Sequence, residues 1–373
     1  MDLVLTHIDL SHKGGGEVVI LDIAKKFNPV IYVTSYTPEL TFPEFKEFDI
    51  RVLPKTSFEK LPLFGDKVHS GLSFYTNKLK DNYDVISAHY SPAELIRNKN
   101  PRVCWVLYSP FREVYDIYEE NMASSSFLTK TRLFFGAKLY RTLSSQVVPK
   151  IEKICPISEV VNLRLKKYLH RDDGEIIHPG IDASEYSCGS YDKYFFYPSR
   201  LCYLKRFEIA IDAFRKFSEK HKDWKLVIAG FVNKRDEWYL PKLREFASNS
   251  NVEIIYNPTK KHLQKLYSNC YATVFSAYDE DFGLVLLEAM ASKKPVISIN
   301  EGGPKYIIDD NNTGYLVNSS DEMAEKMSFL ASNPGLCEKL GKAGRSRVIK
   351  KFTKKKFLNK LEIAFKDVAK NHE

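Results

Sequence analysis

The chain has 373 residues, of which 44% are hydrophobic and 28% are charged, as is ordinary for a globular protein of roughly two domains. It contains no run of about 18 uncharged apolar residues and no N-terminal basic region with a cleavage site, so we expect neither a transmembrane helix nor a signal peptide. The formal net charge of +9 suits an anionic membrane surface, a phosphorylated substrate or lysines spread over surface helices, and no RNP, zinc-finger or helix-turn-helix signature supports a nucleic-acid partner.

Short apolar runs alternate with longer helical patterns in the first half of the chain. Several runs are continuously apolar, as expected for strands of a parallel sheet that is covered on both faces. We predict strands at residues 3–8, 30–35, 49–54, 84–90, 102–109, 153–158 and 175–179. After the first strand, Gly14, Gly15 and Gly16 lead into a helix that we expect to begin at Glu17. Glycine allows a close backbone approach to a ligand, but the spacing matches neither the dinucleotide nor the P-loop pattern.

The same alternation restarts in the second half. We predict strands at residues 193–198, 225–230, 252–257, 271–277, 295–299 and 314–317, with helices at 205–221, 235–248 and 284–293. Two successive series of this kind indicate an α/β fold with two doubly wound parallel sheets. The break falls near residues 181–193, which are rich in Ser, Gly and Asp and poor in aliphatic residues.

The predicted organisation has three parts. They are a Rossmann-like domain at residues 1–185, a second one at 186–350 and a C-terminal helix at 351–373. Phe357, Leu361 and Phe365 form one apolar stripe on the basic tail, so we expect this helix to pack back towards the first domain.

The six cysteines are scattered and form no CxxC pair: Cys104, Cys155, Cys188, Cys202, Cys270 and Cys337. This distribution argues against a zinc site or a disulfide framework and suits a reducing cytoplasm. We expect them to be small core residues.

The segment "YDEDFGLVLLEAM" at 278–290 carries two carboxylates with different settings. Glu280 lies in the loop that follows a predicted strand, and Glu288 lies inside the next helix, which Gly283 opens. Ligands of parallel sheets bind at the carboxyl ends of strands, and helix N-termini bind anions. Since carboxylates accept hydrogen bonds from sugar hydroxyls, the spacing suits a ligand with a sugar, phosphates and a ribose. A capping acid and a solvated helix face remain the alternative.

The segment "FYPSRLCYLKRFEIAIDAF" at 196–214 adds two cations at the same kind of position. Arg200 follows a predicted strand and Lys205 precedes a helix. Fixed positive charge is what a diphosphate requires, above all when it departs as a leaving group. Taken alone, two such residues are more often ordinary surface residues.

These motifs together resemble the retaining family 4 glycosyltransferases, which have the GT-B fold of two Rossmann-like domains facing across a cleft. Glu280-x7-Glu288 resembles the E-x7-E signature, "PSRLCYLKR" the family's phosphate clamp and "GGGE" its N-terminal glycine loop. "WVLYSPFREVYD" (105–116) is similar to a segment of mannosyltransferase members. "HPGID" (178–182) and "NEGGPKYIIDDNNTGYLV" (300–317) match further family segments, so the likeness covers nearly the whole chain.

The resemblance implies a role for each matching residue. Glu280, Arg200 and Lys205 would be catalytic, with Glu280 at the donor sugar and the two cations at the diphosphate. Glu288 would bind the nucleotide ribose. The remaining implied donor contacts come from the helix start and from the glycine loop: Phe282, Gly283, Leu284, Gly15 and Gly16.

The acceptor side departs from the family pattern. Many members carry a histidine near the reacting carbon where this chain has Tyr108. A tyrosine is no base near neutral pH without a large pKa shift, so we expect Tyr108 to hydrogen-bond a sugar. His89 and Arg112 are further acceptor-side candidates, and a buried structural role is the alternative for His89.

The implied reaction transfers a sugar with retention of anomeric configuration, uses a nucleotide sugar as co-substrate and needs no cofactor. Asp279 and Asp281 spell a D-x-D pattern, which binds a divalent metal in another glycosyltransferase class. We expect no metal here, because Arg200 and Lys205 supply the positive charge.

Other functions remain open. The resemblance favours mannosyl transfer from GDP-mannose, while UDP-glucose and UDP-N-acetylglucosamine stay as alternative donors. A sugar-nucleotide epimerase, a silent sugar-nucleotide-binding subunit and an NAD dehydrogenase are rivals. The E-x7-E pair argues against the epimerase, and the missing GxGxxG argues against the dehydrogenase. The silent subunit is disfavoured because all four charged residues are present: Glu280, Glu288, Arg200 and Lys205.

The segment "SFLTKTRLFFGAKLYRTL" at 126–143 bears on localisation and on the acceptor. It mixes cationic with large apolar side chains, a composition that suits an anionic membrane surface. A helix that lines the cleft is the alternative. We expect a cytoplasmic protein with weak peripheral binding to the inner face of the cell membrane, and a glycan or lipid-linked glycan as acceptor.

Overall fold

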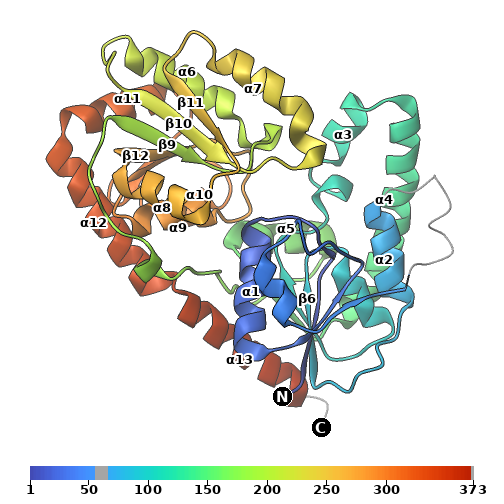
Figure 1. Ribbon diagram of the computed structural model, residues 1–373. Coiled ribbons are helices and arrows are strands. Elements are labelled where there is room, and N and C mark those ends of the chain that lie inside the picture. Colours follow the sequence, from blue (N-terminus) through green and yellow to red (C-terminus); the bar gives the residue numbers. More distant parts are fainter. Residues whose placement is uncertain (55–65, 371–373) are drawn as a thin grey trace. The chain divides into compact units, whose positions relative to one another are not determined.

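The computed structural model describes residues 1–54 and 66–370. The chain folds into two compact units, each described here by itself (Figure 1). Unit 1 comprises residues 1–178 and the chain from Leu358 onward, and unit 2 comprises Pro179–Phe357. The chain first passes from unit 1 to unit 2 after His178, whereas we expected this domain boundary at residue 185.

Unit 1 is built on a parallel sheet with the strand order β5-β3-β1-β6-β7-β8. The strands are β1 (Leu3–Thr6), β3 (Val30–Val33), β5 (Ile50–Val52), β6 (Val85–His89), β7 (Val103–Leu107) and β8 (Lys153–Pro156), and β2 (Asp9–Leu10) pairs separately with β4 (Ser35–Tyr36). The α-helices are α1 (Gly15–Phe27), α2 (Asp66–Thr76), α3 (Tyr118–Ser124), α4 (Phe127–Val147) and α5 (Glu159–Leu169). The central strands β6 and β7 are buried along their whole length, as a sheet covered on both faces requires.

Unit 2 repeats this topology with the order β11-β10-β9-β12-β13-β14, also parallel throughout. Its strands are β9 (Tyr194–Pro198), β10 (Lys225–Gly230), β11 (Val252–Tyr256), β12 (Ala272–Phe275), β13 (Val296–Ile299) and β14 (Gly314–Val317). The helices are α6 (Phe207–Ser218), α7 (Leu240–Ala247), α8 (Lys260–Asn269), α9 (Leu284–Ala291), α10 (Pro304–Ile307), α11 (Ser320–Ser332) and α12 (Pro334–Lys351). In Figure 1, α6, α7 and α11 cover one face of this sheet, and α8 and α9 cover the other.

Short 3-10 helices complete the connections. They are η1 (Pro43–Glu47), η3 (Ala93–Asn98), η4 (Arg112–Val114), η5 (Val148–Lys150), η6 (Ala183–Glu185), η7 (Tyr203–Lys205) and η8 (Lys234–Tyr239). Two of them, η7 and η8, follow β9 and β10 at the carboxyl edge of the second sheet. They therefore lie where ligands of such sheets bind.

Three sequence expectations need correction. Residues 175–179 are not a strand, because only the N–H groups of Glu175 and Ile177 bond to β8, at 3.0 and 2.9 Å. The first helix begins at Gly15, two residues before Glu17. The C-terminal helix does not begin at residue 351, since α12 ends at Lys351 and α13 (Lys354–Lys370) begins after a break.

The break before α13 has a structural cause. The Ile181 N–H donates to Phe352 O, and the Lys354 N–H donates to Ile181 O, both at 3.0 Å, so the chain is extended at Thr353. Beyond it, the apolar stripe on α13 is buried, and Phe365 packs edge-on against Phe27 of α1 with 5.5 Å between ring centroids. None of the helices within the described residues is long and apolar enough to cross a membrane.

Candidate functional site

Strand order reverses at one place in each sheet, between β1 and β6 in unit 1 and between β9 and β12 in unit 2. At such a point the connections of two neighbouring parallel strands diverge to opposite faces and leave a crevice at their carboxyl ends. In unit 2, β9 leads into the segment with Arg200 and Lys205, and β12 leads into residues 278–283. The chain thus brings the two predicted charged segments to a single crevice.

The Lys205–Glu280 ion pair joins these segments. Lys205 Nζ lies 2.5 Å from Glu280 Oε2, and the two side chains are only 15% and 21% exposed. Lys205 Nζ also lies 5.6 Å from the centre of the Phe275 ring at the end of β12. The pair therefore has little water around it, which strengthens its electrostatic attraction. It also leaves a lysine and a carboxylate side by side at the mouth of the crevice.

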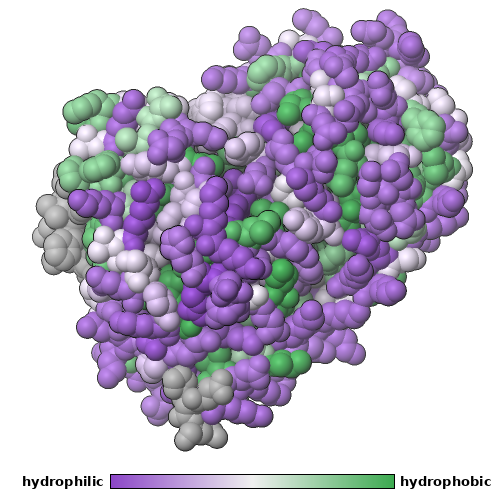
Figure 2. Space-filling model, turned by 180° about the vertical axis from the view of Figure 1, so that it is seen from behind, coloured by the Kyte–Doolittle hydropathy of each residue, from purple (hydrophilic) through white to green (hydrophobic). Residues whose placement is uncertain are grey.

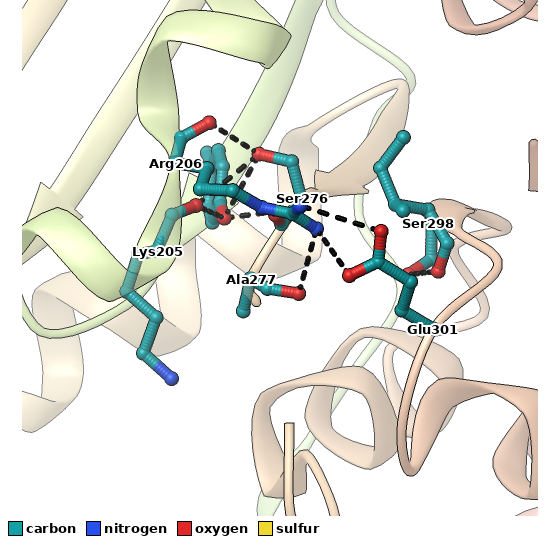
Figure 3. Close-up of polar contacts among 8 residues, drawn as sticks. Lys205, Arg206, Ser276, Ala277, Ser298 and Glu301 are labelled. Carbon is teal, nitrogen blue, oxygen red and sulfur yellow. Dashed lines mark hydrogen bonds and ion pairs between the residues drawn. The ribbon is translucent and has the colours of Figure 1, made fainter. Parts of the chain in front are cut away.

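Arg206, which the sequence analysis did not single out, fixes the backbone next to Lys205 (Figure 3). Its guanidinium donates to Ser276 O at 2.8 Å and to Glu301 Oε2 at 2.7 Å. Its backbone is left-handed, with φ of 46°. In Figure 3 the Lys205 side chain leaves this cluster in a different direction from Arg206. Arg206 thus anchors the turn, and Lys205 is left to face Glu280.

Two glycines bring the loop after β13 against the Glu280 segment. A Cβ on Gly302 would lie 2.5 Å from both the backbone N and O of Glu280, and one on Gly303 would lie 2.5 Å from Phe282 O. The Gly303 N–H donates to Glu280 O at 2.6 Å. Any side chain at either position would push the two loops apart, because backbone atoms cannot yield as a flexible side chain can. The glycines of "NEGGP" therefore hold Glu280 in place.

Gly283 opens α9 with φ of 106°, a conformation that glycine adopts without strain. Among the described residues no side chain caps this helix. The Leu286 N–H donates to Gly283 O at 3.0 Å, and the N–H groups before it, with the positive end of the helix dipole, can receive an anion. Phe282 is 4% exposed, so only its backbone can serve a ligand. Leu284 is the first residue of α9.

Glu288 lies in the middle of α9, partly buried, and is held by a tyrosine that the sequence analysis missed. The Tyr267 O–H on α8 donates to Glu288 Oε2 at 2.5 Å. Burial raises the pKa of the Glu288 carboxyl above its usual range, while hydrogen bonds from Tyr267 and Tyr186 lower it. The tyrosine occupies one carboxylate oxygen, and each carboxylate oxygen has two lone pairs, so Glu288 keeps acceptor capacity.

Arg200 follows β9 and faces a buried acid. Its Nε lies 3.9 Å from Asp236 Oδ2, and Asp236 is 6% exposed. Burial acts to lower the pKa of Arg200, but nearby groups, with Cys202 first and Asp236 and Glu280 after it, raise it above its usual range. The turn at Arg200 lies tight against β10, because a Cβ on Gly230 would overlap Ser199 O at 1.6 Å. Arg200, Lys205 and Glu280 therefore belong to one electrostatic cluster.

In unit 1 the crevice between β1 and β6 is lined by the glycine loop. Glu17 of α1, 3% exposed, places Oε1 at 3.1 Å from His12 Nε2 and at 3.5 Å from His7 Nε2. The other ring nitrogen of His12 lies 3.2 Å from Asp9 Oδ1. Hydrogen bonds to the two acids raise the pKa of His12 to about 10, against the opposing effect of burial. Burial opposes ionisation of Glu17, but the two histidines lower its pKa to about 2.

The other side of this crevice is aromatic. A Cβ on Gly16 would lie 2.0 Å from the Tyr90 hydroxyl, so only glycine at position 16 lets the Tyr90 side chain lie against the glycine loop. Tyr90 stacks on Tyr108 with 4.1 Å between centroids and an interplanar angle of 7°. Tyr108 is 5% exposed beneath it, and His89 is fully buried, with Nδ1 at 3.3 Å from the Tyr108 hydroxyl and Nε2 at 2.7 Å from Ser87 Oγ.

Burial affects the protonation of the two acceptor-side candidates His89 and Tyr108. Desolvation lowers the pKa of His89 and raises that of Tyr108, so both are neutral core groups near neutral pH. His89 is thus buried and hydrogen-bonded, its acceptor-side role stays a prediction, and Tyr90 is the aromatic residue next to the glycine loop. Arg112 is held by Asp116 of the same turn, at 2.8 Å from Nε to Oδ2. An acceptor role for Arg112 and donor contacts for Gly15 and Gly16 stay predictions.

The described residues contain no group of three or more His, Cys, Asp or Glu side chains placed to hold a metal ion. All six cysteines are free thiols, five of them buried and Cys188 half-buried. Cys104 Sγ and Cys155 Sγ lie 3.7 Å apart on neighbouring strands β7 and β8.

Comparisons with known proteins show which proteins the chain is similar to. Residues 187–347, nearly all of unit 2, match the family described as glycosyl transferases group 1. The chain is 25% identical to the alpha-1,3/1,6-mannosyltransferase ALG2 of Dictyostelium discoideum, with 98% of both chains covered. It is 32% identical over 203 residues to a probable sucrose-phosphate synthase of Thermosipho melanesiensis, a match that spans 50% of this chain and 47% of that protein.

The solved structures bear on the fold. HepE of Anabaena, determined in complex with UDP and glucose, superposes with a TM-score of 0.76 at 14% identity and covers 98% of this chain and 99% of its own. WaaG, a glycosyltransferase involved in lipopolysaccharide biosynthesis, gives a TM-score of 0.73 at 15% identity over 96% of this chain and 98% of its own. The predicted α/β fold with two Rossmann-like domains, the GT-B fold, is confirmed.

The His12 network predicts a pH dependence of stability. The folded pKa of His12 is raised, so its stabilising effect is complete below the unfolded value of 6.5 and is lost as pH rises towards about 10. We expect His12→Gln to lower the free energy of unfolding more at pH 6 than at pH 10, as urea denaturation would measure. His170→Asn, at the exposed end of α5, is the matched control. An equal loss at both pH values would contradict the assignment.

Proposed function

We propose that the chain, whose residues 187–347 match the group 1 glycosyl transferases, is a retaining glycosyltransferase that uses a nucleotide-sugar donor. One observation carries the proposal. The Lys205–Glu280 pair, at 2.5 Å, stands at the strand-order reversal of unit 2, beside the uncapped start of α9. A cation, a carboxylate and helix amides at one crevice fit a sugar diphosphate.

The proposed reaction breaks the bond between the donor's anomeric carbon and its phosphate oxygen. The acceptor oxygen bonds to the same carbon from the same face, and its proton passes to the departing phosphate. Lys205, Arg200 and the amides of α9 would stabilise the charge that develops on the diphosphate. Glu280 would accept hydrogen bonds from the sugar hydroxyls. We propose that no metal ion or cofactor takes part, because these cations supply the required charge.

The proposed donor is GDP-mannose. In support, ALG2 of Dictyostelium is named a mannosyltransferase and aligns over 98% of this chain. The alternative is a UDP-sugar, since HepE was determined with UDP and glucose. Under both proposals, Glu288 with its partner Tyr267 would receive the ribose hydroxyls. A silent sugar-nucleotide-binding subunit is the remaining alternative, and the acceptor would be a glycan or lipid-linked glycan.

Thermal unfolding with a panel of GDP-mannose, UDP-glucose, UDP-N-acetylglucosamine, GDP and UDP tests the donor assignment. A ligand that binds only the folded state raises its melting temperature. We expect GDP-mannose and GDP to do so in the wild type, and the shift to be lost in Glu288→Ala. A Tyr267→Phe variant should retain most of the shift, because the carboxylate remains. If no nucleotide produces a shift, the proposed function is wrong.

The second prediction separates catalysis from binding. We expect Glu280→Gln to lower kcat by at least about 100-fold, the usual cost of removing a group that acts in the transition state. Donor affinity, measured by calorimetry, should change by less than about tenfold, because Glu288 and Arg200 remain. Glu301→Gln is the matched control: it touches Arg206 on the far side of the turn and should keep most of the activity. Activity of Glu280→Gln close to that of the wild type would remove Glu280 from the mechanism.

We also propose a membrane-facing surface on α4, consistent with a cytoplasmic protein bound at the inner face of the cell membrane. Phe127 and Leu128 are 82% and 72% exposed, and Phe134 and Phe135 are 48% and 45% exposed. Lys138 lies on the same side of the helix, opposite the buried residues Gly136 and Tyr140. In Figure 2 apolar patches stand among polar ones at the upper left, where α3 and the start of α4 lie.

Vesicle sedimentation tests this surface. We expect binding to vesicles that contain phosphatidylglycerol at low salt, weaker binding at high salt, and little binding to pure phosphatidylcholine. Changing Phe127 and Leu128 together to Ser should weaken binding more than about tenfold, because each apolar side chain contributes about 1.5–3 kcal/mol on burial. Phe329→Ser, on α11 and 47% exposed, is the control. No binding to anionic vesicles at low salt would refute the surface.

A further inference from the structure

Two exposed aromatic rings stand together at the carboxyl edge of the second sheet. Tyr203 in η7 and Trp238 in η8 are 42% and 53% exposed, and their ring centroids are 5.8 Å apart. The rings are tilted by 40° to one another. Since η7 and η8 follow the neighbouring strands β9 and β10, the pair lies on the same edge as Arg200 and Lys205.

The turn that carries Trp238 is anchored on both sides. Asp236, two residues earlier, is buried and faces Arg200 at 3.9 Å. Tyr239, the next residue, is 4% exposed, and its hydroxyl donates to Glu208 Oε2 at 2.9 Å. The turn is therefore anchored before and after Trp238, while about half of the indole faces water.

The third member of this group is cationic. Lys242 of α7 places Nζ at 5.2 Å from the Trp238 ring centre. The group thus offers two aromatic faces, a phenol hydroxyl and an ammonium. Aromatic faces carry a negative quadrupole, which attracts the weakly positive C–H bonds on the apolar face of a pyranose ring. The hydroxyl and the ammonium can bond the sugar hydroxyls at its rim.

We propose that Tyr203, Trp238 and Lys242 form a binding platform for a pyranose ring of the glycan acceptor. The inference rests on the proposed function, which supplies the glycan. The platform lies at the edge that carries Arg200 and Lys205, so a bound glycan would lie next to the donor crevice of unit 2. A nucleobase also stacks on aromatic rings, but the proposed ribose contact, Glu288, lies on α9, beyond β12 and away from β10 in strand order.

Tryptophan fluorescence tests the platform directly. The chain has three tryptophans, and Trp105 and Trp224 are buried, at 0% and 5% exposure, so acrylamide quenching reports chiefly on Trp238. The probes are mannotriose, maltotriose and chitotriose. We expect at least one trisaccharide to protect Trp238 from quenching. The proposal is overturned if none protects it, or if GDP or UDP protects it and no trisaccharide does.

Variants then assign the contact. We expect Trp238→Ala to weaken binding of the protecting trisaccharide about five- to tenfold and Trp238→Phe to retain most of it. Donor affinity should stay within about twofold, since no proposed donor contact is removed. Phe246→Ala, on α7 and 41% exposed, is the control for loss of a surface aromatic ring. Equal losses in Trp238→Ala and Phe246→Ala would overturn the platform.

The two proposals fail in different ways. Trisaccharide protection needs no donor, so a wild-type protein that binds a trisaccharide and no nucleotide refutes the transferase proposal alone. A protein that binds a nucleotide sugar but leaves Trp238 open to acrylamide in every trisaccharide refutes the platform alone.

Discussion

The reversal of strand order between β9 and β12 is the constraint on which the site of unit 2 depends. It makes two strands neighbours although more than seventy residues separate them in the chain, and both run in the same direction. Their carboxyl ends therefore deliver Lys205 and Glu280 to one crevice, and β13 delivers Gly302 and Gly303 beside them. None of these residues would meet in an antiparallel arrangement, in which successive strand ends alternate between the two edges.

At this crevice Lys205 and Glu280 form an ion pair whose hydrogen bonds a ligand can replace. A lysine or a carboxylate removed from water alone carries a large desolvation cost, which the Lys205–Glu280 contact partly offsets. A diphosphate can take over the hydrogen bonds of Lys205, and sugar hydroxyls can satisfy the carboxylate of Glu280. The pair thus keeps both groups in place before a ligand arrives. Arg206 makes this possible, because its bonds to Ser276 and Glu301 fix the turn independently of the ligand.

The sequence predicted the doubly wound sheets because buried parallel strands are continuous apolar runs, and it placed Glu280 and Lys205 correctly at strand ends. It could not predict Arg206–Glu301 or Tyr267–Glu288, since these pairs join residues 95 and 21 positions apart with no local pattern. The predicted strand at residues 175–179 is wrong because its pattern does not report backbone pairing. An apolar run predicts burial, but only two backbone bonds connect that segment to β8, so no strand forms. Glu17 was read as a helix start, whereas its carboxylate is a buried anchor for two histidines.

The same topology gives the two units different chemistry. In unit 1, Tyr90 and Tyr108 stack on each other at the strand-order reversal between β1 and β6. The cationic side chain of this crevice is His12, and each of its ring nitrogens contacts a carboxylate, of Asp9 or of Glu17. Those bonds hold the glycine loop, and they leave His12 no ring nitrogen for a phosphate. In unit 2 the cations face the crevice from strand ends, and the start of α9 has no capping side chain among the described residues. Stacked aromatic rings suit a neutral sugar, whereas two cations beside a helix start suit a diphosphate. The fold therefore sets where the two crevices lie, while the side chains after the reversing strands give each crevice its own charge and shape.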